Sequence, residues 1–198
     1  MTIYTINNMN IIVSVDEHNC IGNNNDLIYD IKEDKIYFRE VTSGSAVVMG
    51  RNTWESIPRK PLPNRINIII SKTLLDADYP DTFIYDSFET FMLNVYQNTF
   101  INPITSQCYA IYIIGGSQLY SHVLQHYEVD TIYKTVIKDP QVSPTVLSHP
   151  IYFPAVDWNK YTLIHTTSHM TTNYTCQYHK TNEPVECIFE IYFQGETI

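Results

Sequence analysis

The stretch Ile113-Ile114-Gly115-Gly116-Ser117-Gln118-Leu119-Tyr120 joins an apolar, strand-like run to an amphipathic helical pattern through two adjacent glycines. Glycine has no Cβ, so a ligand or another backbone segment can approach the chain closely at this turn. The start of the following helix offers free N–H groups and the positive end of the helix dipole to an anion. The stretch is therefore typical of a seat for a nucleotide pyrophosphate, although a strand followed by Gly-Gly is more often an ordinary tight turn.

Length and composition indicate a globular protein. The chain has 198 residues, of which 44% are hydrophobic, which suits one domain with a core and a small-molecule cleft. No apolar run approaches the roughly 20 residues needed to span a bilayer, and the first ten residues lack the pattern of a signal peptide. We therefore expect a soluble, intracellular protein of the cytoplasm, organised as a single domain over residues 1–198.

The net charge of −9 argues against non-specific binding to nucleic acid or to an anionic membrane. Against this background, five of the 12 basic residues fall within 22 positions: Arg51, Arg59, Lys60, Arg65 and Lys72. Such a cluster indicates either a solvated loop or a site for a ligand with several negative charges.

Cysteine and histidine spacing predicts no metal site. The four cysteines, Cys20, Cys108, Cys176 and Cys187, show no C-x-x-C spacing and are expected to be free thiols. Two histidine pairs are four residues apart, His122 with His126 and His165 with His169, but neither contains the Glu of an H-E-x-x-H motif.

Hydrophobic periodicity predicts an α/β fold. Strands are expected at residues 10–15, 46–49, 66–71, 82–85, 110–114, 131–137, 161–168 and 187–193. Helices are expected at residues 31–41, 52–57, 87–98 and 117–126, the third capped by Ser87, and loops at residues 23–25 and 102–106. The alternation indicates a central, mostly parallel eight-stranded twisted sheet that ends in an antiparallel hairpin and is flanked by about four helices. Ligands should bind at the carboxyl ends of the parallel strands.

The first predicted helix carries a carboxylate and an aromatic ring on one face. Asp34 and Phe38 are four residues apart, so they point the same way. The ring suits packing on a flat ligand and the carboxylate suits pairing with amidine-like N–H groups; a solvated acid beside a core Phe is the alternative. The polar loop at residues 21–29, just before this helix, is a candidate lid.

Five blocks of sequence resemble one known family. They are Ile21-Gly22, "VMGRNTWESIP" at residues 48–58, "PLPNRIN" at residues 61–67, Ile70-Ser71 and Ile114-Gly115-Gly116. In this order and at these separations they closely resemble the dihydrofolate reductases, and the resemblance extends over about residues 10–193. It implies an enzyme that reduces 7,8-dihydrofolate to 5,6,7,8-tetrahydrofolate for one-carbon metabolism and thymidylate synthesis. In that reaction a hydride passes from NADPH to pterin C6 and a proton adds at N5.

The resemblance implies a role for each matching residue on the folate side. Asp34 matches the family's buried acid, which binds the pterin N3 and 2-amino group and favours protonation of N5 through water. Thr135 matches the threonine that supports this acid, and Tyr29 stands where an indole usually holds a water beside it. The expected substrate-binding residues are Ile12, Phe38 and Ile114 at the pterin, Ile57 and Leu62 at the p-aminobenzoyl ring, and Arg65 at the glutamate α-carboxylate.

On the cofactor side, the resemblance implies binding by Ser14, Ile21, Gly22, Gly50, Arg51, Asn52, Thr53, Ser71, Lys72, Gly115, Gly116, Ser117, Gln118, Leu119 and Tyr120. The residues from Gly50 to Thr53 match the contacts to the phosphates, and Ser71 and Lys72 match those near the adenosine 2′-phosphate, so NADPH is expected rather than NADH. The adenosine-binding part of the domain would cover about residues 42–120. The two glycines of the opening stretch match a pair that the family joins by a cis peptide bond.

Four departures from the family pattern bear on function. Ile28-Tyr29 replaces the Pro-Trp that usually ends the lid, and Lys35 stands where an apolar side chain lines the folate site. Ser14 replaces a customary alanine, and Ser148-His149 stands in place of an Asp-Thr pair, so closure of the lid would rely on other contacts.

The expected ligands are dihydrofolate and antifolates, and we expect a monomer. Two other functions stay open at the level of sequence. A related pyrimidine reductase of riboflavin synthesis would keep the cofactor site but has no need for Asp34, Phe38 and Arg65 together. A non-catalytic protein that keeps the fold, for example as a partner of thymidylate synthase, would be consistent with the lid substitutions and the 16 tyrosines.

Overall fold

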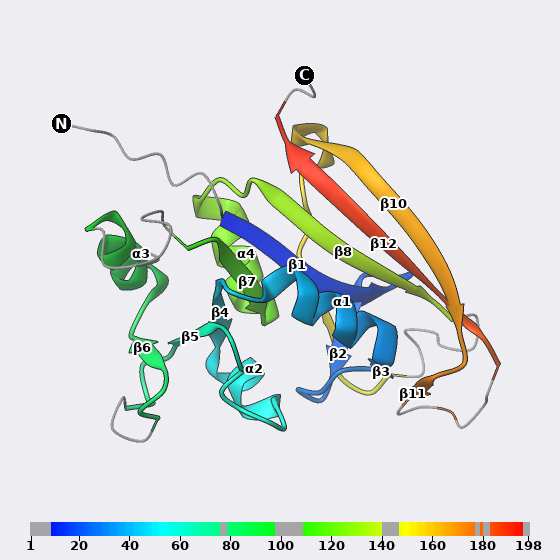
Figure 1. Cartoon of the computed structure of the whole chain (residues 1–198), viewed down its shortest axis with the longest axis horizontal. Coiled ribbons are helices and arrows are strands. Elements are labelled where there is room, and N and C mark those ends of the chain that lie inside the picture. Colours follow the sequence, from blue (N-terminus) through cyan, green and yellow to red (C-terminus); the bar gives the residue numbers. More distant parts are fainter. Residues whose placement is uncertain are drawn as a thin grey trace.

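An eight-stranded sheet forms the centre of the molecule in the computed structural model, which describes residues 9–75, 79–97, 109–139, 147–176, 179 and 183–195. Its strand order is β10-β12-β8-β1-β7-β4-β5-β6 (Figure 1). The strands are β1 (Met9–Asp16), β4 (Ala46–Gly50), β5 (Ile66–Ile70), β6 (Phe83–Tyr85), β7 (Ile111–Gly115), β8 (Thr131–Lys138), β10 (Tyr161–Thr171) and β12 (Val185–Gln194). Each corresponds to one predicted strand, so the eight-stranded α/β prediction is confirmed.

The sheet is parallel except at one side. Strands β8, β1, β7, β4, β5 and β6 pair in parallel, whereas β12 runs antiparallel to both β8 and β10. The carboxyl ends of the parallel strands therefore meet at one edge, where α/β proteins bind ligands. In the pairing of β1 with β8, Ser14 lies opposite Thr135, so the two side chains leave the sheet on the same face.

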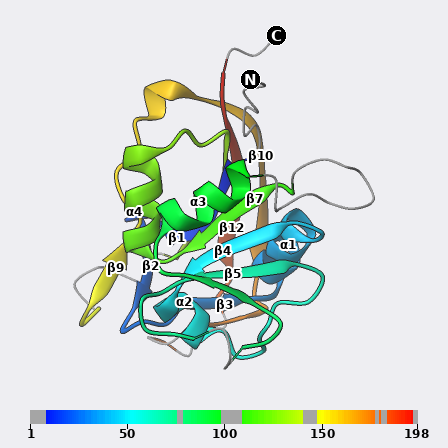
Figure 2. The same ribbon diagram turned by 90° about the vertical axis from the view of Figure 1, so that its left-hand side faces the viewer.

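Four helices cover the two faces of the sheet: α1 (Lys32–Thr42), α2 (Arg51–Ser56), α3 (Phe88–Tyr96) and α4 (Ser117–His126). Helices α3 and α4 lie on one side and α1 on the other (Figure 2). Strand β1 serves both faces, because successive side chains point in opposite directions. Ile11 and Val13 pack in the core with α3 and α4, while Ile12 packs in the other core with Trp54 and Phe38.

Short elements add two small pairs that the sequence did not predict. Strand β2 (Cys20–Asn23) pairs with β9 (Pro150–Tyr152), and β3 (Tyr29–Ile31) pairs with β11 (Tyr174–Cys176). A 3₁₀ turn, η3 (Trp158–Lys160), precedes β10. Asn23 belongs to β2 rather than to the predicted loop, while the backbones of Asn24 and Asn25 are left-handed, as in a turn. The second predicted loop, at residues 102–106, lies outside the described residues.

None of the helices among the described residues is long and apolar enough to cross a membrane.

The third helix begins as predicted, because the Ser87 hydroxyl accepts a hydrogen bond from the Thr90 backbone N–H at 3.1 Å. This bond satisfies one of the N–H groups that a helix start leaves without an internal partner.

Replacing Ser87 by alanine should lower the free energy of unfolding by about 1 kcal/mol, because the cap is lost while the helix residues are unchanged. Urea denaturation followed by circular dichroism measures the difference. Ser168→Ala on the exposed surface of β10 is the matched control and should change stability by less than half as much. Equal stability of Ser87→Ala and the native chain would contradict this role.

Candidate active site

The carboxylate of Asp34 lies near the carboxyl ends of β1 and β8, next to two hydroxyl groups. Asp34 lies in the first turn of α1, where the helix dipole favours a negative charge. The hydroxyls of Thr135 and Ser14 both hydrogen-bond to its carboxyl group. Because these two residues are opposite one another on β8 and β1, the sheet register itself sets the position of the acid.

Burial and hydrogen bonding act on Asp34 in opposite directions. Burial raises the pKa of Asp34 and is the largest effect, while the hydrogen bonds from Thr135 and Ser14 and the charge of Lys35 lower the pKa. The net result is a pKa above the ordinary value for aspartate. Asp34 still keeps some exposed surface, so it combines a raised proton affinity with access for a small molecule.

Apolar side chains expected at the folate site come together in one cluster. Ile12 is buried there, and the partly buried side chains packed around it include Phe38, Ile57, Leu62 and Ile114. These residues come from β1, α1, the segment after α2 and the end of β7. The structure therefore assembles an apolar wall from positions up to about a hundred residues apart in the sequence.

Two arginines lie beside this wall. The guanidinium carbon of Arg65 is 5.5 Å from the centre of the Phe38 ring, within cation–π distance. Its Nη1 donates to Thr42 Oγ1 and its Nε to the Pro63 carbonyl, each at 3.0 Å. Burial and then the nearby charge of Arg39 lower the pKa of Arg65. A fixed guanidinium with a second cation close by is suited to an anionic group; the sequence reasoning had missed Arg39.

The Gly-Gly turn lies against the turn between β4 and α2. Gly115 and Gly116 are joined by a cis peptide bond, as the family resemblance implied. A Cβ on Gly115 would lie 3.2 Å from Thr53 Oγ1, and a Cβ on Gly50 would lie 3.8 Å from the Gly115 carbonyl oxygen. Gly115 also has φ +124°, a backbone region that side chains disfavour. The two strand ends therefore form one narrow backbone cradle.

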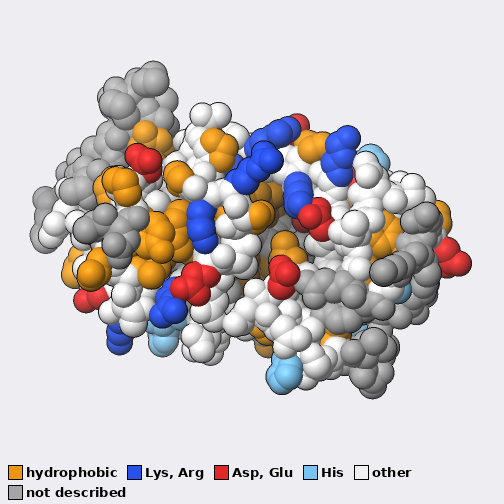
Figure 3. All heavy atoms as spheres, turned by 90° about the horizontal axis from the view of Figure 1, so that it is seen from below, with side chains coloured by type: hydrophobic (Ala, Val, Ile, Leu, Met, Phe, Trp, Pro, Cys, Tyr) orange, Lys and Arg blue, Asp and Glu red, His pale blue; other side chains and the backbone are white. Residues whose placement is uncertain are grey.

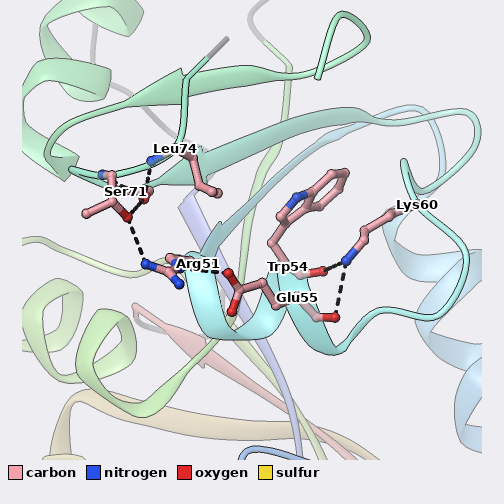
Figure 4. Close-up of polar contacts among 7 residues, drawn as sticks. Arg51, Trp54, Glu55, Lys60, Ser71 and Leu74 are labelled. Carbon is pink, nitrogen blue, oxygen red and sulfur yellow. Dashed lines mark hydrogen bonds and ion pairs between the residues drawn. The ribbon is translucent and has the colours of Figure 1, made fainter. Parts of the chain in front are cut away.

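A polar cluster adjoins the cradle at the start of α2 (Figure 4). Arg51 Nη1 donates to Thr73 Oγ1 at 2.9 Å, and its Nε pairs with Glu55 Oε1 at 2.7 Å. Ser71 Oγ accepts hydrogen bonds from the backbone N–H groups of Thr73 and Leu74 at 3.2 Å. Thr73 was not predicted from the sequence. Of the other predicted residues here, Asn52 and Lys72 are exposed and Thr53 is half-buried.

Lys60, also in the basic cluster of the sequence, has a structural contact instead. Its Nζ donates to the backbone carbonyls of Trp54 and Glu55 at 2.9 and 3.1 Å (Figure 4). These carbonyls end α2, where a cation compensates the helix dipole. Part of the basic cluster therefore stabilises a helix end.

The candidate lid is tied to β9 by side-chain and backbone contacts. Asn23 Oδ1 accepts from the His149 N–H at 2.7 Å, and Asn24 Nδ2 donates to Ser148 Oγ at 3.0 Å. Gly22 is required in the turn, because a Cβ there would lie 2.6 Å from the Asp26 carbonyl oxygen. Of the two hydrogen bonds, the one to the Ser148 hydroxyl depends on a side chain that departs from the family pattern, whereas the one from His149 uses its backbone.

Tyr29 and Lys35 have polar neighbours that the sequence did not indicate. Burial, followed by the nearby Asp139, Cys176 and Asp16, raises the pKa of the Tyr29 hydroxyl. The Lys35 ammonium pairs with Asp30 Oδ2 at 2.6 Å rather than reaching across a folate site.

The α4 residues expected at the cofactor differ among themselves in exposure. Tyr120 is 3% exposed and its hydroxyl donates to the Ile12 carbonyl at 2.8 Å, so it supports β1 from the core. Leu119 is also buried, whereas Gln118 is exposed. Ser117 Oγ donates to the Tyr152 carbonyl in β9 at 2.8 Å, and Ile21 packs against the core formed with α4. The start of α4 therefore also helps to hold the lid.

The edge that carries these groups is concave. Figure 3 shows that this face is hollowed near its middle, with Lys and Arg side chains along one rim and hydrophobic side chains within the hollow. A cleft with an apolar interior, a buried acid and a basic rim suits a flat, polar-edged ligand that carries negative charge.

Comparisons with known proteins agree with this arrangement. The sequence model of the family described as "Dihydrofolate reductase" matches residues 8–183. A dihydrofolate reductase of Schistosoma mansoni is 36% identical over 160 residues, which cover 77% of this chain and 81% of that protein. A putative dihydrofolate reductase of Caenorhabditis elegans is 37% identical over 138 residues, covering 65% of this chain and 71% of the relative.

A solved structure shares the fold. Dihydrofolate reductase from Enterococcus faecalis, complexed with NADP(H) and RAB-propyl, superposes with a TM-score of 0.70 over 96% of this chain and 98% of that chain, at 21% identity. At this level of identity the likeness concerns the arrangement of strands and helices.

The Ser14 hydroxyl should hold the pKa of Asp34 down, because its hydrogen bond favours the ionised carboxylate. Ser14→Ala should therefore raise the pKa of Asp34 further, and Thr135→Val should act in the same direction. Titration of the Asp34 carboxyl carbon by NMR, assigned with Asp34→Asn, measures both shifts. Ser168→Ala should leave the titration unchanged; a pKa that falls or stays constant in Ser14→Ala would refute the hydrogen bond.

Proposed function

The chain belongs to the dihydrofolate reductase family, and from that premise we propose that it reduces 7,8-dihydrofolate to 5,6,7,8-tetrahydrofolate with NADPH. The observation that supports this most is the position of Asp34. It lies in the first turn of α1, the helix that also carries Phe38 of the apolar wall, and the hydroxyls of Thr135 and Ser14 lower its pKa. A protein that only bound a nucleotide would have no use for a partly accessible acid with a raised pKa.

The residues of the cradle fit a dinucleotide. Gly50, Gly115 and Gly116 leave open backbone beside Thr53, where side chains would close the space. The start of α4 follows directly and provides N–H groups suited to a phosphate. When bound, the cofactor supplies the hydride that reduces the C6=N5 bond of the pterin. The cradle's part in the proposal is to place the nicotinamide ring next to the apolar wall.

Asp34 has two tasks in the proposed reaction. Its carboxylate binds the pterin through N3 and the 2-amino group, which fixes C6 toward the cradle. It also keeps a proton available near the pterin, and water carries a proton to N5 as C6 is reduced. Thr135 and Ser14 orient the carboxylate, since each donates a hydrogen bond to it.

Arg65 and Arg39 are suited to bind the glutamate tail of the substrate. Arg65 is held in place by Thr42 and Pro63, so its guanidinium loses little entropy on binding a carboxylate. Arg39 adds a second positive charge near the same position. We assign Arg65 to the α-carboxylate of the glutamate and Arg39 to its other carboxylate.

Cofactor preference follows from the polar cluster at the start of α2. Arg51 projects toward Thr73, next to Ser71, so one guanidinium and two hydroxyls converge outside the cradle (Figure 4). A phosphate on the adenosine ribose would receive a hydrogen bond there in which both partners are charged, whereas the 2′-hydroxyl of NADH carries no charge. The proposed cofactor is therefore NADPH.

Asp34→Asn should lower the rate of NADPH oxidation with dihydrofolate by roughly 10²-fold or more near neutral pH, as expected for loss of an acid–base group. In the native chain the rate should fall as pH rises through the raised pKa of Asp34, because N5 must gain a proton. Steady-state rates at 340 nm across pH give both results.

Ser168→Ala should reproduce the native pH profile, and Ser14→Ala should move its decline to higher pH. Full activity of Asp34→Asn would remove Asp34 from the mechanism. If the native chain binds NADPH and folate but does not turn over, the protein is instead a binding protein that keeps the fold.

Arg51→Gln should raise KM for NADPH by roughly tenfold, the effect of losing one charge-assisted hydrogen bond, with little change for NADH. Arg59→Gln, a neighbouring exposed arginine of the same basic cluster, is the control and should leave both constants unchanged. Steady-state kinetics with each cofactor at saturating dihydrofolate test this. An equal loss for both cofactors would show that Arg51 does not distinguish them.

A further inference from the structure

Three side chains that commonly bind metals meet outside the site described above. Asp139 follows the end of β8, Cys176 is the last residue of β11, and His179 follows that strand. One ligand atom from each lies within 4.8 Å of the other two. His179 Nε2 is 2.7 Å from Asp139 Oδ2. Cys176 and His179 are three residues apart in the sequence, whereas Asp139 precedes Cys176 by 37 residues, so the sequence alone does not indicate the full cluster.

The cluster is sheltered from solvent. The side chain of Asp139 is 1% exposed and that of His179 is 12% exposed, while Cys176 is partly buried. Isolated charges are costly in such surroundings, so a carboxylate there needs a cation or strong hydrogen bonds. In surface clusters of acidic residues, by contrast, water meets that need.

Two buried oxygen atoms, from Tyr29 and Asp16, also lie near Asp139 and Cys176. Tyr29 lies opposite Cys176 in the pairing of β3 with β11, and only 8% of the residue is exposed. Its hydroxyl makes no hydrogen bond of normal geometry to a described residue, although the Asp139 carboxylate and Cys176 lie near it. Asp16, which ends β1 beside β8, also acts on the Tyr29 hydroxyl, and its Oδ2 is buried without a hydrogen bond among the described residues.

The chemistry of the donors matches zinc. Zinc in proteins is bound tetrahedrally by thiolate, imidazole and carboxylate groups, and such donors lie about 3.3–3.8 Å from one another around the ion. The observed donors are already within 4.8 Å, so binding requires small movements only. The contact between His179 and Asp139 would open from 2.7 Å as the ion takes its place.

We propose that Asp139, Cys176 and His179 form a zinc-binding site, with the Tyr29 hydroxyl facing the fourth position. Binding releases the thiol proton of Cys176 and uses the neutral imidazole of His179. The thiolate and the carboxylate then balance the two charges of the ion. The site joins the end of β8, which carries Thr135, to the β3–β11 pair, which leads into α1 and Asp34.

Zinc binding can be measured directly on the full chain after treatment with a chelator. Titration with Zn²⁺ in competition with a chromogenic chelator should give one equivalent bound. Replacing the metal by Co²⁺ should produce a thiolate-to-cobalt charge-transfer band. Because the ion binds the folded chain, Zn²⁺ should also raise the melting temperature.

Cys176→Ser and His179→Gln should each weaken Zn²⁺ binding by roughly tenfold or more, and Cys176→Ser should abolish the cobalt–thiolate band. The matched controls are Cys20→Ser, a buried thiol outside the cluster, and His169→Gln, an exposed histidine on β10. Both should bind zinc like the native chain. Circular dichroism of each variant before metal addition verifies that it is folded.

The proposal would be overturned if the native chain bound no stoichiometric zinc. It would also be overturned if the cluster variants and the controls bound Zn²⁺ with equal affinity. In either case the contact between Asp139 and His179 is a hydrogen bond that ties His179, after β11, to the end of β8. These readouts do not involve dihydrofolate or NADPH, so they stand apart from the test of the reductase activity.

Discussion

The position of one carboxylate depends on how two parallel strands are aligned. Asp34 is held by Ser14 and Thr135, and these hydroxyls reach the same point because their residues are opposite one another in β1 and β8. A shift of one residue in this register would turn one hydroxyl to the other face of the sheet. Tyr120 reinforces the alignment, since its buried hydroxyl is bonded to the Ile12 carbonyl two residues before Ser14.

The pKa of Asp34 results from two opposing effects, burial and hydrogen bonding. Each unit of pKa shift corresponds to about 1.4 kcal/mol of difference between the two protonation states. Burial outweighs the two hydroxyls and Lys35, so the pKa of Asp34 stays raised. In a chain with alanine at position 14, one of the opposing hydrogen bonds would be missing. The serine therefore tunes the acid toward ionisation, which favours binding of the pterin N–H groups over retention of the proton.

The main elements could be predicted from sequence because they are periodic. Eight strands and four helices show alternating or helical hydrophobic patterns, and Ser87 marks a helix start by its own chemistry. Strands β2, β3, β9 and β11 have three or four residues, too few for a period, and their pairing is decided by distant partners. Thr73 and Arg39 could not be predicted for the same reason. Thr73 accepts from Arg51 and Arg39 lies near Arg65 only because folding brings these residues together.

Tyr29, which replaces the usual tryptophan, places a hydroxyl group near a second group of polar side chains. The family resemblance matches this residue to an indole that holds a water beside the acid, and in the structure the Tyr29 hydroxyl has Asp139, Cys176 and Asp16 near it. Asp16 ends β1 two residues after Ser14, and Asp139 follows the end of β8, four residues after Thr135. The same two strands therefore position two polar centres, and a phenol at position 29 belongs to the second.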